Sequence, residues 1–215
     1  WWETDLHKSL DELRITGGEP MMSPNLWRLL DWIETQGDKM NPDMRIAINS
    51  NLGAKQSIID RFKKKLKRFK NFHLYTSCEA TFGQAEYIRD GIVYGDWFSN
   101  FLHMMVDKVP SEIHNMCTIN ALCLESLPEL LEKMVWFKSA SKVYGPKVNY
   151  TLNILRFPSF QSPLVLPDDL RNKFKGDIQK FLNNNVKHLE HMEVNQTQRL
   201  IDYLDVVKTP HAGAA

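Results

Sequence analysis

Cysteine, glycine and proline are all scarce in this 215-residue chain, which has 3, 10 and 10 of them. Three cysteines are too few for a disulfide framework, and so little glycine and proline excludes collagen-like and low-complexity structure. No stretch of about 20 apolar residues is present, so a membrane-spanning helix is not expected. The formal net charge is only +1, which argues against a dedicated nucleic-acid binder.

What the chain does have is the composition of a folded domain. Hydrophobic residues make up 43% and charged residues 25%, which is enough apolar surface to offset the entropy of the chain. No targeting signal is recognisable, and the three cysteines fall in apolar segments as reduced thiols would. We therefore expect a cytoplasmic protein. The chain begins with Trp1, so we expect it to be a fragment.

Strand and helix patterns alternate along the first three quarters of the sequence. Strands are predicted near residues 13–16, 44–48, 72–76, 113–119 and 148–155, and helices near 24–36, 55–70, 95–107 and 126–140. Ser23 and Pro24 suit the start of the first of these helices and Gly37 its end. Alternation of this kind is typical of βαβ units and a parallel sheet.

The fold class expected is therefore α/β, a partial (β/α)6-type TIM barrel of parallel strands with outer helices. Residues 1–166 would form the barrel, and residues 167–215 would be C-terminal helices and a tail. We expect the first strand of the barrel to precede Trp1, with residues 1–12 as the helix that follows it. The basic run at 61–70 is expected to be the solvated face of an outer helix rather than an RNA contact.

Polar residues follow each predicted strand, at the sheet edge where parallel α/β folds bind ligands. Gly17-Gly18-Glu19-Pro20 is the most specific of these segments. Two glycines let the backbone approach a ligand closely, and the carboxylate of Glu19 suits a ligand ammonium group. The segment lacks the Lys-Ser/Thr of a P-loop and the third glycine of a dinucleotide fingerprint. Asn51, after the second strand, is a further candidate.

The segment Ile15–Pro20 resembles the GGE motif of radical S-adenosylmethionine (SAM) enzymes. Tyr75–Glu79 with Tyr87–Gly91 resembles the fourth strand and following loop of that family, and Thr118–Asn120 its fifth strand end. The similarity extends over roughly residues 1–170, and the most similar subgroup contains a twitch domain.

The resemblance implies roles for eight residues. The SAM amino group would lie at Gly17, Gly18 and Glu19, the ribose at Ser77 and Glu79, and the SAM carboxylate at Arg89. The backbone from Thr118 to Asn120 would lie along the adenine. Asn51 is a candidate binding residue from its place after the second strand and not from the resemblance. The family usually has Asp where Glu79 stands. No catalytic residue and no metal ligand is assigned, because the histidines show no metal-ligand spacing.

The resemblance also implies a [4Fe–4S] cluster, an electron donor such as flavodoxin or ferredoxin, and a substrate that is a peptide or protein. Reductive cleavage of SAM would yield a 5′-deoxyadenosyl radical that abstracts hydrogen. The CxxxCxxC motif that holds the cluster is absent, because Cys78, Cys117 and Cys123 have the wrong spacing. We expect that motif upstream of Trp1, and we expect the chain alone to be inactive.

Two other functions stay open from the sequence. One is a non-catalytic α/β-barrel module that binds peptide or RNA. The other is a SAM-dependent methyltransferase, which fits less well because its glycine-rich loop normally follows the first strand and an acidic residue ends the second. The presence or absence of three closely spaced cysteines before Trp1 separates the enzyme from the binding module.

Overall fold

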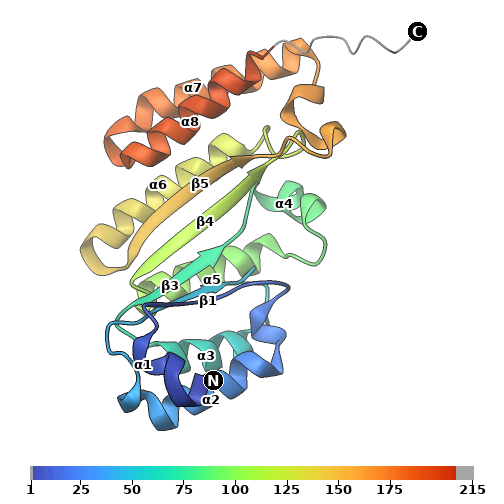
Figure 1. The fold of residues 1–215 in the computed structure, drawn as a ribbon. Helices are drawn as coiled ribbons and strands as arrows, with labels where there is room; N and C mark the ends of the chain where they lie inside the picture. Colours follow the sequence, from blue (N-terminus) through green and yellow to red (C-terminus); the bar gives the residue numbers. More distant parts are fainter. Residues whose placement is uncertain (1, 207–215) are drawn as a thin grey trace.

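The computed structural model describes residues 2–206, and the predicted C-terminal tail lies outside these residues. Strands and helices alternate through most of the chain (Figure 1). The strands are β1 (Glu12–Ile15), β2 (Arg45–Asn49), β3 (Phe72–Thr76), β4 (Glu112–Ile119) and β5 (Lys147–Ile154). The helices are α1 (His7–Ser9), α2 (Pro24–Gln36), α3 (Gln56–Leu66), α4 (Phe82–Ile88), α5 (Tyr94–Val106), α6 (Leu127–Tyr144), α7 (Asp168–Asn185) and α8 (His191–Leu204).

The five strands form one parallel sheet in the sequential order β1-β2-β3-β4-β5. Each neighbouring pair is joined by a crossover that contains at least one helix, as parallel pairing requires. The predicted α/β fold with parallel strands and outer helices is therefore confirmed. Because the strands are parallel and in sequence order, all of their carboxyl ends lie along one edge of the sheet, which we call the carboxyl edge.

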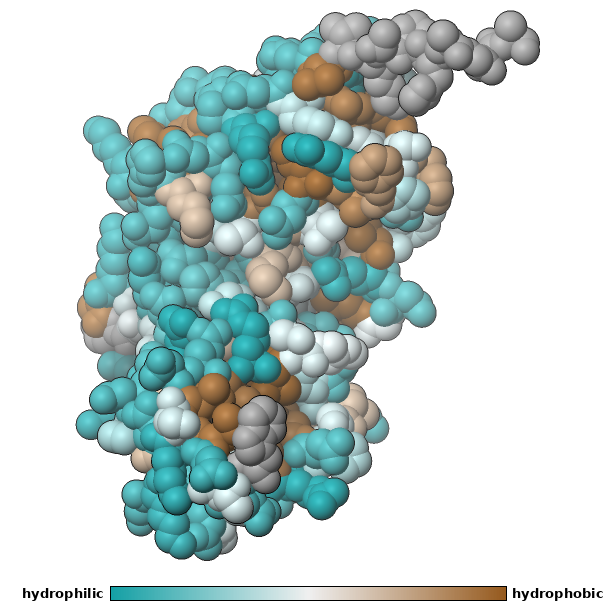
Figure 2. Space-filling view, viewed as in Figure 1, coloured by the Kyte–Doolittle hydropathy of each residue, from teal (hydrophilic) through white to brown (hydrophobic). Residues whose placement is uncertain are grey.

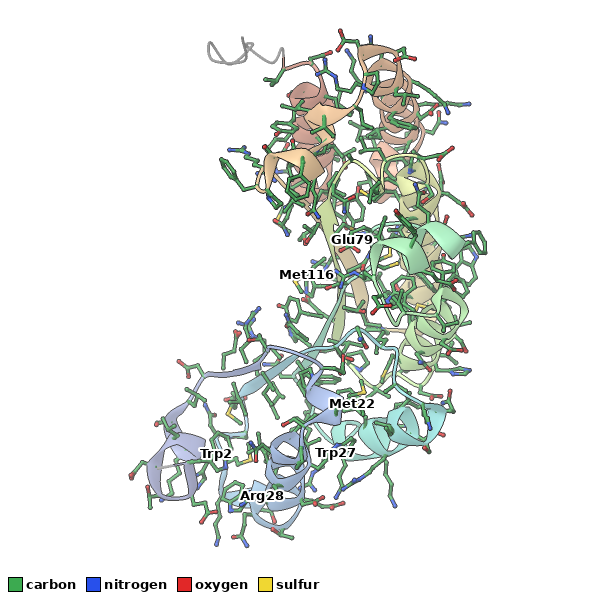
Figure 3. All side chains as sticks on the ribbon, turned by 90° about the vertical axis from the view of Figure 1, so that its right-hand side faces the viewer. Trp2, Met22, Trp27, Arg28, Glu79 and Met116 are labelled. Carbon is green, nitrogen blue, oxygen red and sulfur yellow. The ribbon has the colours of Figure 1, made fainter. Side chains whose placement is uncertain are left out.

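The two faces of the sheet differ in polarity because side chains alternate along each strand. One face packs under the helices and carries buried apolar residues, among them Ile46, Ile48, Phe72, Leu74 and Ile113. The opposite face, here called the inner face, is half-buried and polar. Seen from the side in Figure 3, the sheet and helices curve around an open hollow, and Met116 lies on that open side.

Helix α8 closes the free edge of β5 with side chains instead of a sixth strand. Glu193 accepts a hydrogen bond from the Tyr150 amide at 3.0 Å, and Gln196 accepts one from the Leu152 amide at 2.7 Å. Arg199 donates to the Leu152 carbonyl at 3.0 Å. These contacts satisfy backbone groups that an edge strand would otherwise leave unpaired. The barrel therefore stops at β5 on this side.

Several local expectations need correction. Helix α4 lies between the predicted strand at 72–76 and the predicted helix near 95–107, where no helix was predicted. The N-terminal helical turns end at Ser9, earlier than the predicted residue 12. Ser23 precedes α2, but its side chain makes no cap hydrogen bond. Helix α2 does end at Gln36 with Gly37 as its C-cap, as predicted, and the chain continues from Gly37 (φ −59°) as a 3₁₀ turn. The predicted boundary at residue 166 stays a prediction.

Some lysines of the basic run at 61–70 form ion pairs with acidic residues near neighbouring helices, in addition to facing solvent. Lys65 contacts both Asp31 and Glu34 of α2, and Lys63 lies 2.5 Å from Asp107 after α5. These ion pairs join α3 to its two neighbouring helices. The paired lysines are therefore partly neutralised, and an RNA contact would need their charge.

The face of the molecule drawn in Figure 2 shows no long apolar band. Hydrophilic residues dominate the face in Figure 2, and hydrophobic residues gather there only in separate patches. Among the described residues, none of the helices has the length and apolar character needed to cross a bilayer.

Candidate functional site

The turn after β1 is shaped by its two glycines. Gly17 and Gly18 have φ +89° and +45°, in the region that residues with a side chain rarely adopt. No atom lies within 4 Å of where their Cβ atoms would stand. The glycines are therefore needed for the backbone conformation and not for close packing, and they leave the peptide groups of the turn exposed.

Glu19 is held at the carboxyl edge by three hydrogen-bond donors. Its carboxylate accepts from the Ser50 hydroxyl at 2.9 Å, from the Asn51 amide at 2.7 Å and from the Met21 amide at 3.1 Å. A carboxylate offers about four acceptor positions, so one stays open for a ligand. Groups from the turn after β1 and from the end of β2 thus hold the Glu19 carboxylate in one orientation.

A second polar cluster joins the ends of β3 and β4. Arg89 donates to Glu79 through Nε and Nη2, both at 2.6 Å, and the Thr118 amide donates to Glu79 at 3.2 Å. The Glu79 side chain is only 3% exposed, whereas Arg89 is 34% exposed. The hydrogen bonds from Arg89 to Glu79 raise the pKa of the Arg89 guanidinium. Arg89 is therefore a fixed cation whose outer side reaches solvent.

The pairing leaves half of the Arg89 guanidinium available. A guanidinium has five N–H donors and can bind carboxylates in bidentate fashion. Glu79 occupies the edge formed by Nε and Nη2, so the edge formed by Nη1 and Nη2 stays open for a second carboxylate. Both oxygens of Glu79 are used in this pair, which gives that residue a positioning role for Arg89. Contact between Glu79 and a ribose stays a prediction.

Ser77 follows β3 directly and is half-buried. Within residues 2–206 its hydroxyl has no hydrogen-bond partner, and a ligand hydroxyl could take that place. Asn120, after β4, is instead engaged locally: its side chain donates to the Thr118 carbonyl at 3.3 Å and accepts from the Leu122 amide at 2.8 Å. These two contacts form a turn around Asn120, so its side chain shapes the loop.

The structure brings the predicted residues to one edge in two separate groups. Glu19 and Asn51 form one group and Glu79, Arg89 and Thr118 the other, with Ser77 at the end of the strand between them. A cavity of about 420 Å³ adjoins the glycine turn and is lined by residues between Ile15 and Leu29. That cavity lies against the turn and α2 rather than between the two groups.

The three cysteines do not suit a metal cluster. Cys78, Cys117 and Cys123 are fully buried, and their thiols contact backbone carbonyls at 3.1–3.2 Å. Burial raises the pKa of Cys78 and of Cys123 to about 12, and it raises the pKa of Cys117 as well. Because the three thiols are closed off from solvent and donate to backbone carbonyls, we assign no cluster chemistry to them.

The burial of these thiols gives a direct prediction. In the native chain at pH 8, none of the three cysteines should react with a small aromatic disulfide reagent, because the thiolate fraction is negligible and access is closed. All three should react after unfolding in guanidinium. Absorbance of the released thiol measures both states. Rapid labelling of the native chain would contradict the buried, protonated assignment.

The sequence analysis assigned no metal ligand, but the structure brings one group of metal-ligating side chains together. His73, Glu112 and His114 present their donor atoms within 4.8 Å of one another on the inner face. Glu112 and His114 are two apart on one strand, a spacing that places both on the same face. This spacing was the available signal, but His73 joins them only through the pairing of β3 with β4.

Comparison with solved structures shows the same fold at low sequence identity. The chain matches SuiB of Streptococcus suis with TM-score 0.51 and 12% identity, over 81% of this chain and 37% of SuiB. SuiB bound to its precursor peptide SuiA gives a TM-score of 0.52 and 15% identity, over 81% of this chain and 36% of SuiB. Native anSMEcpe with bound AdoMet and a peptide gives a TM-score of 0.50 and 11% identity, over 81% of this chain and 47% of anSMEcpe.

The chain thus spans less than half the length of these similar structures. No protein-family model matches the chain, and no curated protein matches it either.

Proposed function

We propose that this chain is the SAM-holding core of a radical SAM enzyme, of the kind that contains a twitch domain. The observation that carries the proposal is the pair of oriented, opposite charges at the carboxyl edge: Glu19, held by Ser50 and Asn51, and Arg89, held by Glu79. An amino acid has one ammonium and one carboxylate, so these two charges suit the methionine end of SAM. The fold similarity to a structure with bound AdoMet supports this choice.

Each residue then has a role that follows from its contacts. The open acceptor position of Glu19 takes the SAM ammonium group, with the exposed peptide groups of Gly17 and Gly18 beside it. The free edge of Arg89 takes the SAM carboxylate. The Ser77 hydroxyl bonds the ribose, and the backbone from Thr118 to Asn120 lies along the adenine.

The electron source lies outside these residues. Cys78, Cys117 and Cys123 do not suit a [4Fe–4S] cluster, because they are fully buried, donate to backbone carbonyls and lack the CxxxCxxC spacing. Reductive cleavage of SAM to a 5′-deoxyadenosyl radical needs thiolates from elsewhere in the protein and a donor such as flavodoxin or ferredoxin. We therefore expect the described chain to bind SAM and to have no activity by itself.

A peptide or protein is the substrate class we propose. Two of the similar structures hold a peptide, and the open hollow beside the inner face offers room for one (Figure 3). A reducing compartment such as the cytoplasm agrees with three free cysteines.

Calorimetric titration with SAM tests the proposal, and Ser77→Ala is the most informative variant. The Ser77 hydroxyl has no partner among residues 2–206, so its removal should leave the unfolding free energy within about 0.5 kcal/mol of the parent. Loss of a ribose hydrogen bond of about 0.5–1.5 kcal/mol should weaken SAM binding roughly 2- to 12-fold. Ser139→Ala, on the outer side of α6, should change neither quantity.

A ligand comparison sharpens the test. 5′-Deoxyadenosine lacks the amino and carboxylate groups, so it should bind more weakly than SAM and should not respond to changes at Glu19 or Arg89. If the parent chain binds no SAM, or if Ser77→Ala binds it as tightly as the parent, the assignment of this edge to SAM is wrong. The non-catalytic binding module would then be favoured.

A further inference from the structure

The inner face carries a second cluster of reactive side chains, remote from the carboxyl edge. His73 on β3 pairs in register with Glu112 on β4, and His114 lies two residues further along β4. All three are half-buried. Thr118 at the carboxyl edge is six residues beyond Glu112, which is roughly 20 Å along a strand. The cluster is therefore separate from the residues assigned to SAM.

The donor atoms of the three side chains converge on one point. His114 Nε2 lies 2.8 Å from Glu112 Oε2, and His73 Nδ1 lies 3.4 Å from the same oxygen. Two ligands of a tetrahedral zinc ion stand roughly 3.4 Å apart, given zinc–nitrogen bonds of about 2.0–2.1 Å. The spacing is thus already close to that of a metal site, and only small side-chain movements are needed to admit an ion.

The surroundings support the geometry. The His114 ring stacks on Tyr75 with centroids 4.7 Å apart and planes 9° from parallel, which fixes the plane of that imidazole. Asn149, in register with His114 on β5, is 5% exposed, and its side-chain oxygen has no partner among the described residues. An unpaired buried oxygen on the same face is costly unless something binds it. Asn149 is thus a further polar residue on the same face, one strand away from His114.

The charges around the cluster favour a transition metal over calcium or magnesium. Glu12 on β1 pairs with both Arg14 and Arg45, so it cannot add negative charge to the site. Within residues 2–206, Glu112 is then the single carboxylate of this cluster, and hard cations prefer several oxygen ligands. Imidazole nitrogen suits zinc, copper, nickel and iron, so two histidines and one glutamate select that class.

We propose that His73, Glu112 and His114 form a binding site for a divalent transition-metal ion, with zinc as its probe. Three protein ligands leave at least one coordination position open toward the hollow of the inner face, as in metal sites that bind a further ligand. The site is independent of SAM, and its failure would leave the proposed function untouched.

Zinc titration of the chelator-treated chain, followed by calorimetry, tests the site. The parent should bind one zinc ion per chain, and excess Mg²⁺ or Ca²⁺ should not compete. Glu112→Gln and His114→Gln should each weaken zinc binding more than about 100-fold, beyond the 10- to 100-fold typical of losing an outer-shell partner. His188→Gln changes an exposed histidine in the turn between α7 and α8, outside the cluster, and this variant should bind zinc as the parent does.

A spectroscopic measurement on the parent alone guards against variants that fail to fold. Cobalt-substituted chain should show ligand-field bands of nitrogen and oxygen coordination, with no thiolate charge-transfer band from the buried cysteines. X-ray absorption should show imidazole scattering and no sulfur neighbour. Three results would overturn the proposal. They are failure of the parent to bind one metal ion per chain, the presence of sulfur ligands, and zinc affinity in folded Glu112→Gln equal to that of the parent.

Discussion

Glu193→Gln is expected to lower the free energy of unfolding by about 3–5 kcal/mol, because it leaves a buried ammonium group without its counter-charge. Lys138 donates to both oxygens of Glu193, at 2.9 and 2.8 Å, and the two side chains are 7% and 0% exposed. Glu193 also accepts from the amides of Tyr150 and Glu190. One carboxylate thus ties α6, β5 and the start of α8 together.

Urea unfolding followed by circular dichroism measures this loss as a lower midpoint at an unchanged slope. Lys175→Gln is the matched control, because it breaks an exposed pair with Asp205 and should cost no more than about 1 kcal/mol. Combining Lys138→Met with Glu193→Gln should recover part of the loss, since the unpaired charge is then gone. A midpoint within error of the parent for Glu193→Gln would show that α8 is not anchored through this carboxylate.

Arg89→Ala is expected to act on ligand binding and on stability together. Loss of a charge-assisted contact of about 1.5–3 kcal/mol should weaken SAM binding roughly 10- to 150-fold. The same change leaves Glu79, which is 3% exposed, with only the Thr118 amide as a donor. A buried carboxylate that loses its cation is destabilising, so the melting temperature should fall as well.

Glu79→Gln separates the two effects. Arg89 keeps its charge in that variant but loses its bidentate anchor, so SAM affinity should fall less than in Arg89→Ala. Arg28→Ala, an exposed position on α2 (Figure 3), should change neither affinity nor stability. Equal SAM affinity in Arg89→Ala and the parent, measured below the melting temperature of both, would reject Arg89 as the carboxylate ligand.

Local chemistry made much of the fold predictable. The apolar periodicity of 72–76 and 113–119 defines strands that the structure places at Phe72–Thr76 and Glu112–Ile119. Helix α4 was missed because its seven residues carry little apolar pattern, and its only buried residue is Ala85. Gly37 was placed correctly at the end of α2, where it keeps helical backbone angles because the chain continues as a 3₁₀ turn.

Some residues of the candidate site could likewise be predicted from a local motif, and others could not. Gly17, Gly18 and Glu19 are contiguous, so one turn brings them together and a motif can identify them. Glu79 illustrates the opposite case, because its bond to Arg89 depends on how α4 turns back toward the end of β3. The buried ion pair of Glu79 with Arg89 depends on the tertiary structure and cannot be predicted from the two residue types alone.

The amino-acid order by itself determined the alternating elements, the parallel sheet and the diglycine turn, because these depend on side chains a few residues apart. Only the tertiary structure decided which distant groups meet: Arg89 with Glu79, Glu193 with Lys138, and His73 with Glu112 and His114. Strand register and helix docking set those distances. Both arise from packing over the whole chain, which no local pattern encodes.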